Sequence, residues 1–173
     1  MQFLDAYRSS PRRYILDNVP EARRMMRYVD AIITDDKADP LTQVYERKNE
    51  DLFMEIAMAF AVWKFVFQPR CTSLVVGPNR YIVDRARQFA TRLVERVPGF
   101  NVERARNRLD APGCTSMIFN VASPDTGRGY TITNLFVLNM EAFTAKQKQL
   151  RENIYPVMSA SREPRKWIEG VGI

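Results

Sequence analysis

The distribution of apolar side chains predicts two long helices in the middle of the chain. Leu52 to Phe67 is hydrophobic on nearly every side, which is typical of a helix that is buried all round. This stretch is shorter than the roughly 20 residues that cross a membrane, and Glu55 and Lys64 interrupt it. Arg80 to Val97 has one apolar face and one basic face. We therefore expect one buried helix, one amphipathic helix and no membrane anchor.

Shorter apolar runs predict strands. Ser73 to Gly77 is one such run between turn signals. Met117 to Phe143 has the pattern of a strand, a glycine-containing turn and a second, wholly apolar strand that ends at Asn139. A last short strand is expected at Lys166 to Ile168, and Thr42 to Lys48 is a further candidate.

The chain begins with a segment, residues 1–40, that we expect to be helical and to pack on the rest. Phe3 to Val19 has the pattern of short helical pieces broken at Pro11. Pro20 suits the first position of the helix that follows.

The order of the predicted elements favours an α/β fold. Thr144 and Gln147 form a capping box, which would start a last helix through about Tyr155. Alternation of helices and strands is typical of a mostly parallel sheet flanked by helices. With 173 residues the chain is expected to form a single domain, 1–173, in which 101–113 is a polar connection.

Charge favours an acidic partner. The net charge is +6 and the isoelectric point is near 9.5, as in proteins that neutralise DNA phosphates. Little aromatic interleaving accompanies the arginines, so contacts would be to the DNA backbone. The candidate DNA or partner contacts are Arg80, Arg85, Arg87, Arg92, Arg96, Arg104, Arg106, Arg108 and Arg128. The alternative is a solvated basic surface and, for Arg128, a turn in which Gly127 and Gly129 supply positive φ.

Several classes of catalytic site are excluded. The chain contains no histidine, which excludes a Ser-His-Asp triad, a Cys-His pair and any histidine zinc site. Its two cysteines, Cys71 and Cys114, are too few for a structural zinc cluster, and they suit a reducing cytosol. We expect no bound metal, no cofactor and no catalytic residue.

The order of segments resembles the N-terminal ATPase domain of tailed-phage large terminases, the motors that pump DNA into procapsids. The family's first segment is similar to SPRRYILDNV, and the end of the helix after its phosphate loop is similar to WKFVFQP. Its next strand and helix resemble LVVGPNRYIVDRARQFATRLVERVPGF. Its Arg-Gly loop and the strand with its catalytic acids resemble ASPDTGRG and NLFVLNMEAF. The resemblance covers most of the chain and implies a P-loop-NTPase-like fold.

The motifs that bind ATP in this family are missing. Before the buried helix the family has a glycine-rich loop with Lys and Ser or Thr, whereas this chain has VYERKNEDLF and no glycine before Gly77. Asn49, Glu50 and Asp51 stand at the helix start, where carboxylates would repel a triphosphate. The resemblance therefore implies the fold without a functional phosphate loop.

The second nucleotide motif is also changed. After its apolar strand the family places an Asp and a Glu, whereas this chain has Asn139, Met140 and Glu141. A thioether cannot act as a base and is a poor ligand for magnesium. Glu141 is one position late, which in a strand would turn its side chain to the other face.

These observations predict a catalytically silent, terminase-like phage protein, or pseudo-ATPase. It would act as a binding or structural component in DNA packaging or in the virion. Its partners would be DNA phosphates and packaging or virion proteins, in the host cytoplasm or the virion, with the oligomeric state open. The alternatives are a nonspecific DNA-binding module, a divergent ATPase that uses Lys48, Asp125 and Glu141, a split terminase whose other half lies in another chain, and an unrelated α/β domain.

Overall fold

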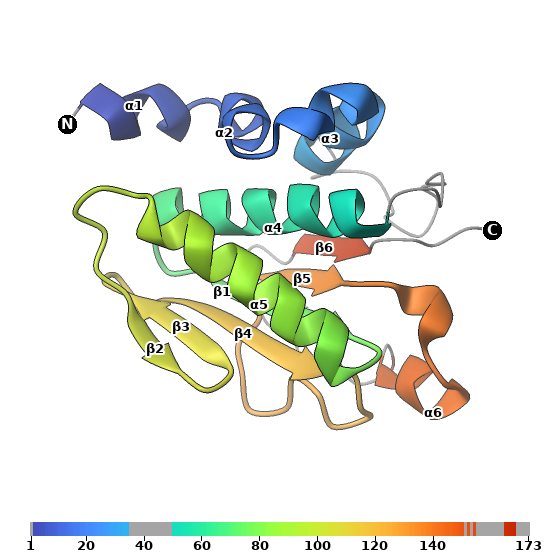
Figure 1. The fold of residues 1–173 in the computed structure, drawn as a ribbon. Helices are drawn as coiled ribbons and strands as arrows, with labels where there is room; N and C mark the ends of the chain where they lie inside the picture. Colours follow the sequence, from blue (N-terminus) through green and yellow to red (C-terminus); the bar gives the residue numbers. More distant parts are fainter. Residues whose placement is uncertain (1, 35–49, 151, 153, 155–164, 169–173) are drawn as a thin grey trace.

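A mixed sheet lies at the centre of the computed structural model, which describes residues 2–34, 50–150, 152, 154 and 165–168 (Figure 1). Its strands, within those residues, are β1 (Thr72–Gly77), β2 (Glu103–Ala105), β3 (Arg108–Ala111), β4 (Thr115–Val121), β5 (Asn134–Val137) and β6 (Arg165–Ile168). Their order across the sheet is β2-β3-β4-β1-β5-β6. β4, β1, β5 and β6 are parallel, whereas β2 and β3 add an antiparallel hairpin beside β4. The predicted α/β fold with a mostly parallel sheet is confirmed.

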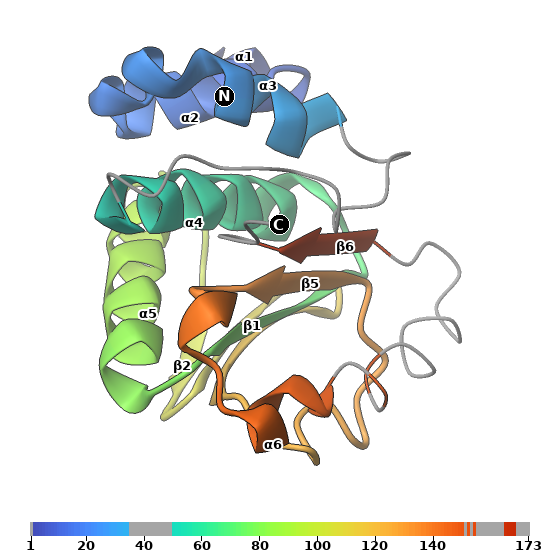
Figure 2. The same ribbon diagram turned by 90° about the vertical axis from the view of Figure 1, so that its right-hand side faces the viewer.

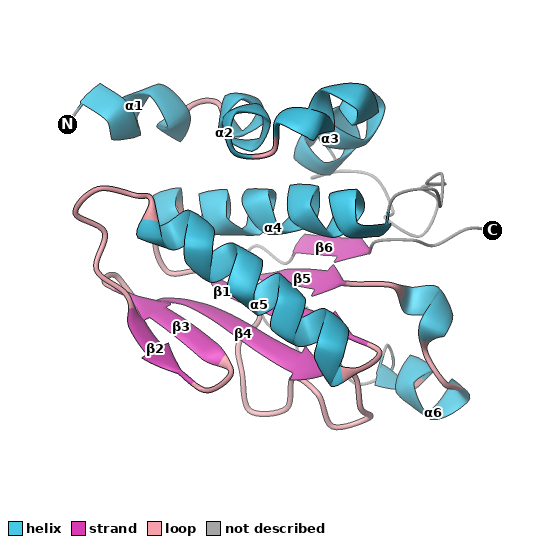
Figure 3. Ribbon diagram, viewed as in Figure 1, coloured by secondary structure: helices cyan, strands magenta, loops and turns pink. Residues whose placement is uncertain are grey.

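The helices that precede β2 in the chain form two further layers on one face of the sheet (Figures 1 and 3). The helical elements are α1 (Gln2–Arg8), α2 (Pro11–Asn18), the 3-10 helix η1 (Pro20–Met25), α3 (Met26–Thr34), α4 (Glu50–Phe67), α5 (Arg80–Glu95), the 3-10 helix η4 (Met140–Ala142) and α6 (Ala145–Lys148). α4 and α5 pack against each other and against the sheet, and α1 to α3 cover α4. Among the described residues, no helix is long and apolar enough to cross a membrane.

The middle strands β1, β4 and β5 contain runs of buried apolar residues because both faces of this part of the sheet are covered. In β1, Val75 belongs to the core beneath α4 and α5, whereas Leu74 and Val76 belong to a second core on the opposite face. The second core is covered by the connection between β4 and β5 and by the segment around α6, which contribute Ile132 and Leu150 (Figure 2). β1, β4 and β5 therefore each contribute to both cores by simple alternation.

The described N-terminal helices, within residues 2–34, pack on α4, whereas residues 35–40 of the predicted segment lie outside the described residues. The indole Nε1 of Trp63 donates a hydrogen bond of 2.7 Å to the carbonyl oxygen of Tyr7, which links α4 to α1. Pro11 is the first residue of α2 and directly follows the N-cap Ser10. Pro20 begins a helix as expected, but its first turns are a 3-10 helix.

The prediction of a polar connection at 101–113 is wrong, because this stretch contains β2 and β3. Leu109 is the buried residue of this hairpin, and its neighbours Arg108 and Asp110 point away from the core. Such a sparse apolar pattern has little signal as a strand on its own. Pairing with β4, which places Leu109 beside Met117, determines the conformation.

The remaining predicted elements are found with adjusted bounds or lie in undescribed regions. The strands expected within 117–143 are β4 and β5, and β1 lies between them, so their connection crosses over β1. The capping box of Thr144 and Gln147 starts α6, and β6 matches the last predicted strand. The candidate strand at Thr42 to Lys48 lies outside the described residues, as do residues 151, 153 and 155 of the last predicted helix.

Candidate functional site

The carboxyl ends of the parallel strands meet the starts of two helices at one edge of the sheet. The backbone N–H of Ala122, just after β4, donates to the carbonyl oxygen of Gly77 at the end of β1. The side chain of Gln147 donates to the carbonyl oxygens of Pro78 and Ala122, which ties the loops after β1 and β4 together. Edges of this kind hold the ligands of open α/β sheets.

An acidic residue at the start of α4 forms an ion pair with an arginine of α5. Asp51 Oδ1 lies 2.6 Å from Arg85 Nη1 of α5, in an ion pair in which the Asp51 side chain is 66% exposed. Glu50 is the first residue of the helix, and Asn49 lies outside the described residues. A carboxylate and its arginine thus lie at the helix start that the sequence resemblance matches to the family's phosphate loop, where backbone amides and a lysine would bind phosphate.

β5 ends at Val137, before the positions that the sequence resemblance matches to the family's catalytic acidic residues. The backbone of Asn139 has φ of 48°, in the left-handed region that Asn tolerates better than most residues. The chain then enters η4, in which Glu141 is exposed. The expectation that Glu141 points to the opposite face of a strand is therefore wrong, because the strand ends at Val137.

Of the three residues of the alternative ATPase site, the structure describes Asp125 and Glu141. Asp125 Oδ1 lies 2.8 Å from Arg128 Nη1, and both side chains are exposed. Lys48 lies outside the described residues. Gly127 and Gly129 have positive φ on either side of Arg128, so this stretch is a turn, as the structural alternative predicted. Among the described residues, no group of three acidic or cysteine side chains could hold a metal ion.

Most of the candidate arginines are paired within the protein. Six of the nine form ion pairs: Arg80 and Arg87 with Asp84, Arg85 with Asp51, Arg104 with Glu95, Arg108 with Asp110 and Arg128 with Asp125. Arg92 lies over the ring of Phe89, at 5.7 Å from its centroid. Arg92, Arg96 and Arg106 have no ion pair with another described residue. The basic region is therefore divided into separate local groups.

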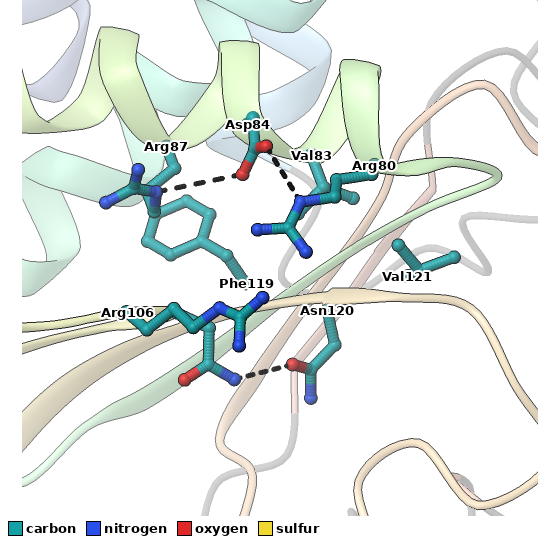
Figure 4. A pocket seen from close by; sticks show the side chains of 9 residues that line it. Arg80, Val83, Asp84, Arg87, Arg106, Phe119, Asn120 and Val121 are labelled. Atoms are coloured by element: carbon teal, nitrogen blue, oxygen red, sulfur yellow. Dashed lines mark hydrogen bonds and ion pairs between the residues drawn. The ribbon is translucent and has the colours of Figure 1, made fainter.

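Three of the arginines line one pocket of about 330 Å³ between α5, the β2–β3 turn and the end of β4 (Figure 4). Positions 80, 83, 84 and 87 share one face of α5 because their spacing follows the helical repeat. The full lining is Arg80, Val83, Asp84, Arg87, Arg106, Asn107, Phe119, Asn120 and Val121.

The pocket has a net positive charge. Its charged side chains are three arginines and Asp84, whose oxygens lie 3.3 Å from Arg80 Nε and 4.0 Å from Arg87 Nε. Asn107 Nδ2, in the turn of the hairpin, donates a hydrogen bond of 2.9 Å to Asn120 Oδ1 of β4. Sequence reasoning missed Asp84 and both asparagines. The available signal was the i, i+4 spacing of Arg80 and Asp84 and the turn preference of Asn107.

The ion pair at the start of α4 lies beside a second carboxylate. Burial raises the pKa of Glu55, and the negative charges of Asp51 and Glu21 raise it further, while Arg85 and Arg92 oppose the shift. A carboxyl group with a raised pKa binds more protons in the folded state, so its contribution to stability falls as pH rises through its titration.

Glu55→Gln is therefore expected to raise the melting temperature at pH 7 and to leave it unchanged at about pH 3, where a free glutamate is protonated. Thermal unfolding followed by circular dichroism at both pH values measures the difference. Glu103→Gln, on the exposed strand β2, is the matched control for loss of a negative charge and should change the melting temperature little at pH 7. A lower melting temperature for Glu55→Gln at pH 7 would contradict the expectation.

Comparison with known proteins shows what the chain is similar to. No protein-family model matches the sequence, and no curated protein sequence does. The structure is similar to the ATPase domain of the large terminase of Thermus phage P74-26, with a TM-score of 0.51 and 22% identity over 70% of this chain and 55% of that one. An arginine-to-alanine mutant of the same domain matches with a TM-score of 0.47 and 21% identity over 70% and 56% of the two chains. This chain thus spans just over half the length of the terminase chains that it matches. Its fold is therefore similar to that of a phage large-terminase ATPase domain, as the sequence had suggested.

Proposed function

We propose that the protein is a terminase-like phage component that works by binding and does not hydrolyse ATP. In this proposal it is a single domain of residues 1–173 in the host cytoplasm or the virion. Its partners are DNA phosphates and packaging or virion proteins. The observation that carries the proposal is the ion pair of Asp51 with Arg85 at the start of α4.

The physical argument is electrostatic. A triphosphate at the start of the P-loop helix needs backbone amides, a lysine and the positive end of the helix dipole. Asp51 brings a negative charge to that end, and its 2.6 Å contact with Arg85 makes this arginine less available to a phosphate. The glycines that let a backbone wrap a phosphate are absent from the sequence before α4.

The second nucleotide motif supports the same conclusion. Magnesium prefers carboxylate oxygens and water, and the attacking water needs a base. Asn139 offers one amide oxygen, and Met140 offers a sulfur that neither binds magnesium well nor accepts a proton. Two independent requirements of ATP hydrolysis are therefore unmet.

Phosphate release from ATP and thermal unfolding in millimolar magnesium-ATP test the proposal. We expect release at the level of a buffer blank and no magnesium-dependent rise in melting temperature. Lys48→Ala should behave like the parent protein in both assays. A magnesium-dependent stabilisation lost in Lys48→Ala, or phosphate release lost in Glu141→Gln, would show an active ATPase and overturn the proposal.

A nonspecific DNA-binding module is the second candidate function. The convergence of Arg80, Arg87 and Arg106 on one pocket favours it. Binding carried by phosphate contacts weakens steeply as salt rises, because neutralised phosphates release counterions. Equal affinity for duplex DNA at low and high salt would contradict this function.

A further inference from the structure

We infer that the pocket between α5, the β2–β3 turn and the end of β4 is a phosphate-binding site that takes a phosphate of a DNA backbone. This inference deepens the DNA-binding part of the proposed function and rests on it for the source of the phosphate. It selects three of the nine candidate arginines, Arg80, Arg87 and Arg106, and assigns the contact to them.

The arginines reach the pocket from two separate elements. Arg80 and Arg87 extend from α5, and Arg106 extends from the turn of the hairpin on the other side (Figure 4). Guanidinium groups present several N–H donors in a planar fork, which suits the oxygens of a phosphate. A phosphate between the two elements could accept hydrogen bonds from both.

Asp84 holds Arg80 in place but does not neutralise the charge of the three arginines. Its carboxylate accepts a hydrogen bond from Arg80 Nε at 3.3 Å and lies 4.0 Å from Arg87 Nε, which is beyond hydrogen-bond distance. The Nε atom of Arg87 is shielded from solvent and lacks a hydrogen-bond partner among the described residues. Arg106 likewise has no described ion-pair partner. One carboxylate against three arginines leaves two positive charges for an anion to balance.

The lining favours the phosphate of a polymer over a free nucleotide. Phe119 is the aromatic residue of the lining, and it is only 2% exposed, so the pocket offers no open ring on which a base could stack. The Arg80 side chain is 66% exposed, so the pocket opens to the surface, where a continuous backbone can pass. Its volume of about 330 Å³ is sufficient for a phosphate with its sugar.

The matched variants are Arg106→Gln and Arg104→Gln. Both remove one charge from the same exposed hairpin, two positions apart, but Arg104 is paired with Glu95 at 2.9 Å and does not line the pocket. Fluorescence anisotropy of a labelled duplex at low salt measures affinity, and circular dichroism checks that each variant is folded. Arg106→Gln should bind about tenfold more weakly, as for loss of a charge-assisted contact. Arg104→Gln should stay within about twofold, as for an exposed paired residue.

The salt dependence gives a second readout. The slope of log affinity against log salt should become shallower by about 0.9 for Arg106→Gln, because one fewer phosphate is neutralised. Equal losses for the two variants, or unchanged affinity for Arg106→Gln, would overturn the site. If adenosine monophosphate competes with the duplex at equal phosphate concentration, the phosphate in the pocket comes from a free nucleotide. That result would overturn the assignment to the DNA backbone.

The two proposals fail in different ways. ATP hydrolysis together with a selective loss in Arg106→Gln would overturn the silent ATPase and support the phosphate pocket. Background hydrolysis together with equal losses in Arg104→Gln and Arg106→Gln would overturn the pocket and support the silent ATPase. Any stabilisation by ATP that is independent of magnesium and lost in Arg106→Gln would mark free nucleotide in the pocket, which again overturns the backbone assignment.

Discussion

Phe65→Ala is expected to lower the free energy of unfolding by about 3–5 kcal/mol, the usual cost of removing a large aromatic side chain from a core. Phe65 lies on α4, is 1% exposed and packs edge-on against Phe100 at 5.6 Å between ring centroids. The loss has two parts. The free energy gained by burying the aromatic ring is lost, and a cavity remains because the closely packed neighbours only partly fill the space. Equilibrium unfolding in urea measures it.

Tyr81→Ala is the matched control for this substitution. Tyr81 is also an aromatic residue on a central helix, but it is 68% exposed. Its removal should change the free energy of unfolding by no more than about 0.5 kcal/mol, as at most surface positions. Equal losses at Phe65 and Tyr81 would show that α4 is not the buried helix that its apolar pattern predicts.

Gly127→Ala is expected to cost about 2–4 kcal/mol of stability, as the sum of backbone strain and crowding. Gly127 has φ of 92°, a conformation that residues with a Cβ rarely adopt. A Cβ at this position would lie 3.0 Å from Ile132 Cδ1 and 3.1 Å from Ile154 Cγ1, in the second core of the sheet. Thermal and urea unfolding measure the loss.

Gly129→Ala separates the two contributions. Gly129 has a similar φ of 81°, but a Cβ there would have no heavy atom within 4 Å. It should therefore cost only the strain of the left-handed backbone, about 1–2 kcal/mol. A loss at Gly127 no larger than at Gly129 would mean that the second core yields to the extra methyl group. In either case these glycines are required by the turn around Arg128.

Elements with a strong local pattern could be predicted from the sequence. α4 and α5 were predicted because their apolar residues alone indicate a helix and its buried side. β1 and β5 were predicted because strands buried on both faces are continuous apolar runs. In these elements the neighbours in sequence carry the information.

The β2–β3 hairpin could not be predicted, because its conformation depends on pairing with β4. β3 has one fully buried side chain, Leu109, and β2 has none. β2 pairs with β3 and β3 pairs with β4, so backbone pairing and not a local pattern of hydrophobicity determines the hairpin. The same hairpin carries Arg106 to the pocket, which is why the pocket was also missed.

What the sequence determined by itself is the chemistry that is missing. Residue identity alone shows that histidine is absent, that no glycine precedes α4 and that positions 139 and 140 are Asn and Met in place of acidic residues. It also shows the excess of basic residues. The tertiary structure decided which arginines are neutralised and which share a pocket. Arg85 meets Asp51 across 34 positions of sequence, and Arg106 reaches the pocket lined by Arg80 only through the hairpin. Ion pairs act over a few ångströms of space, and folding, not spacing along the chain, sets those distances.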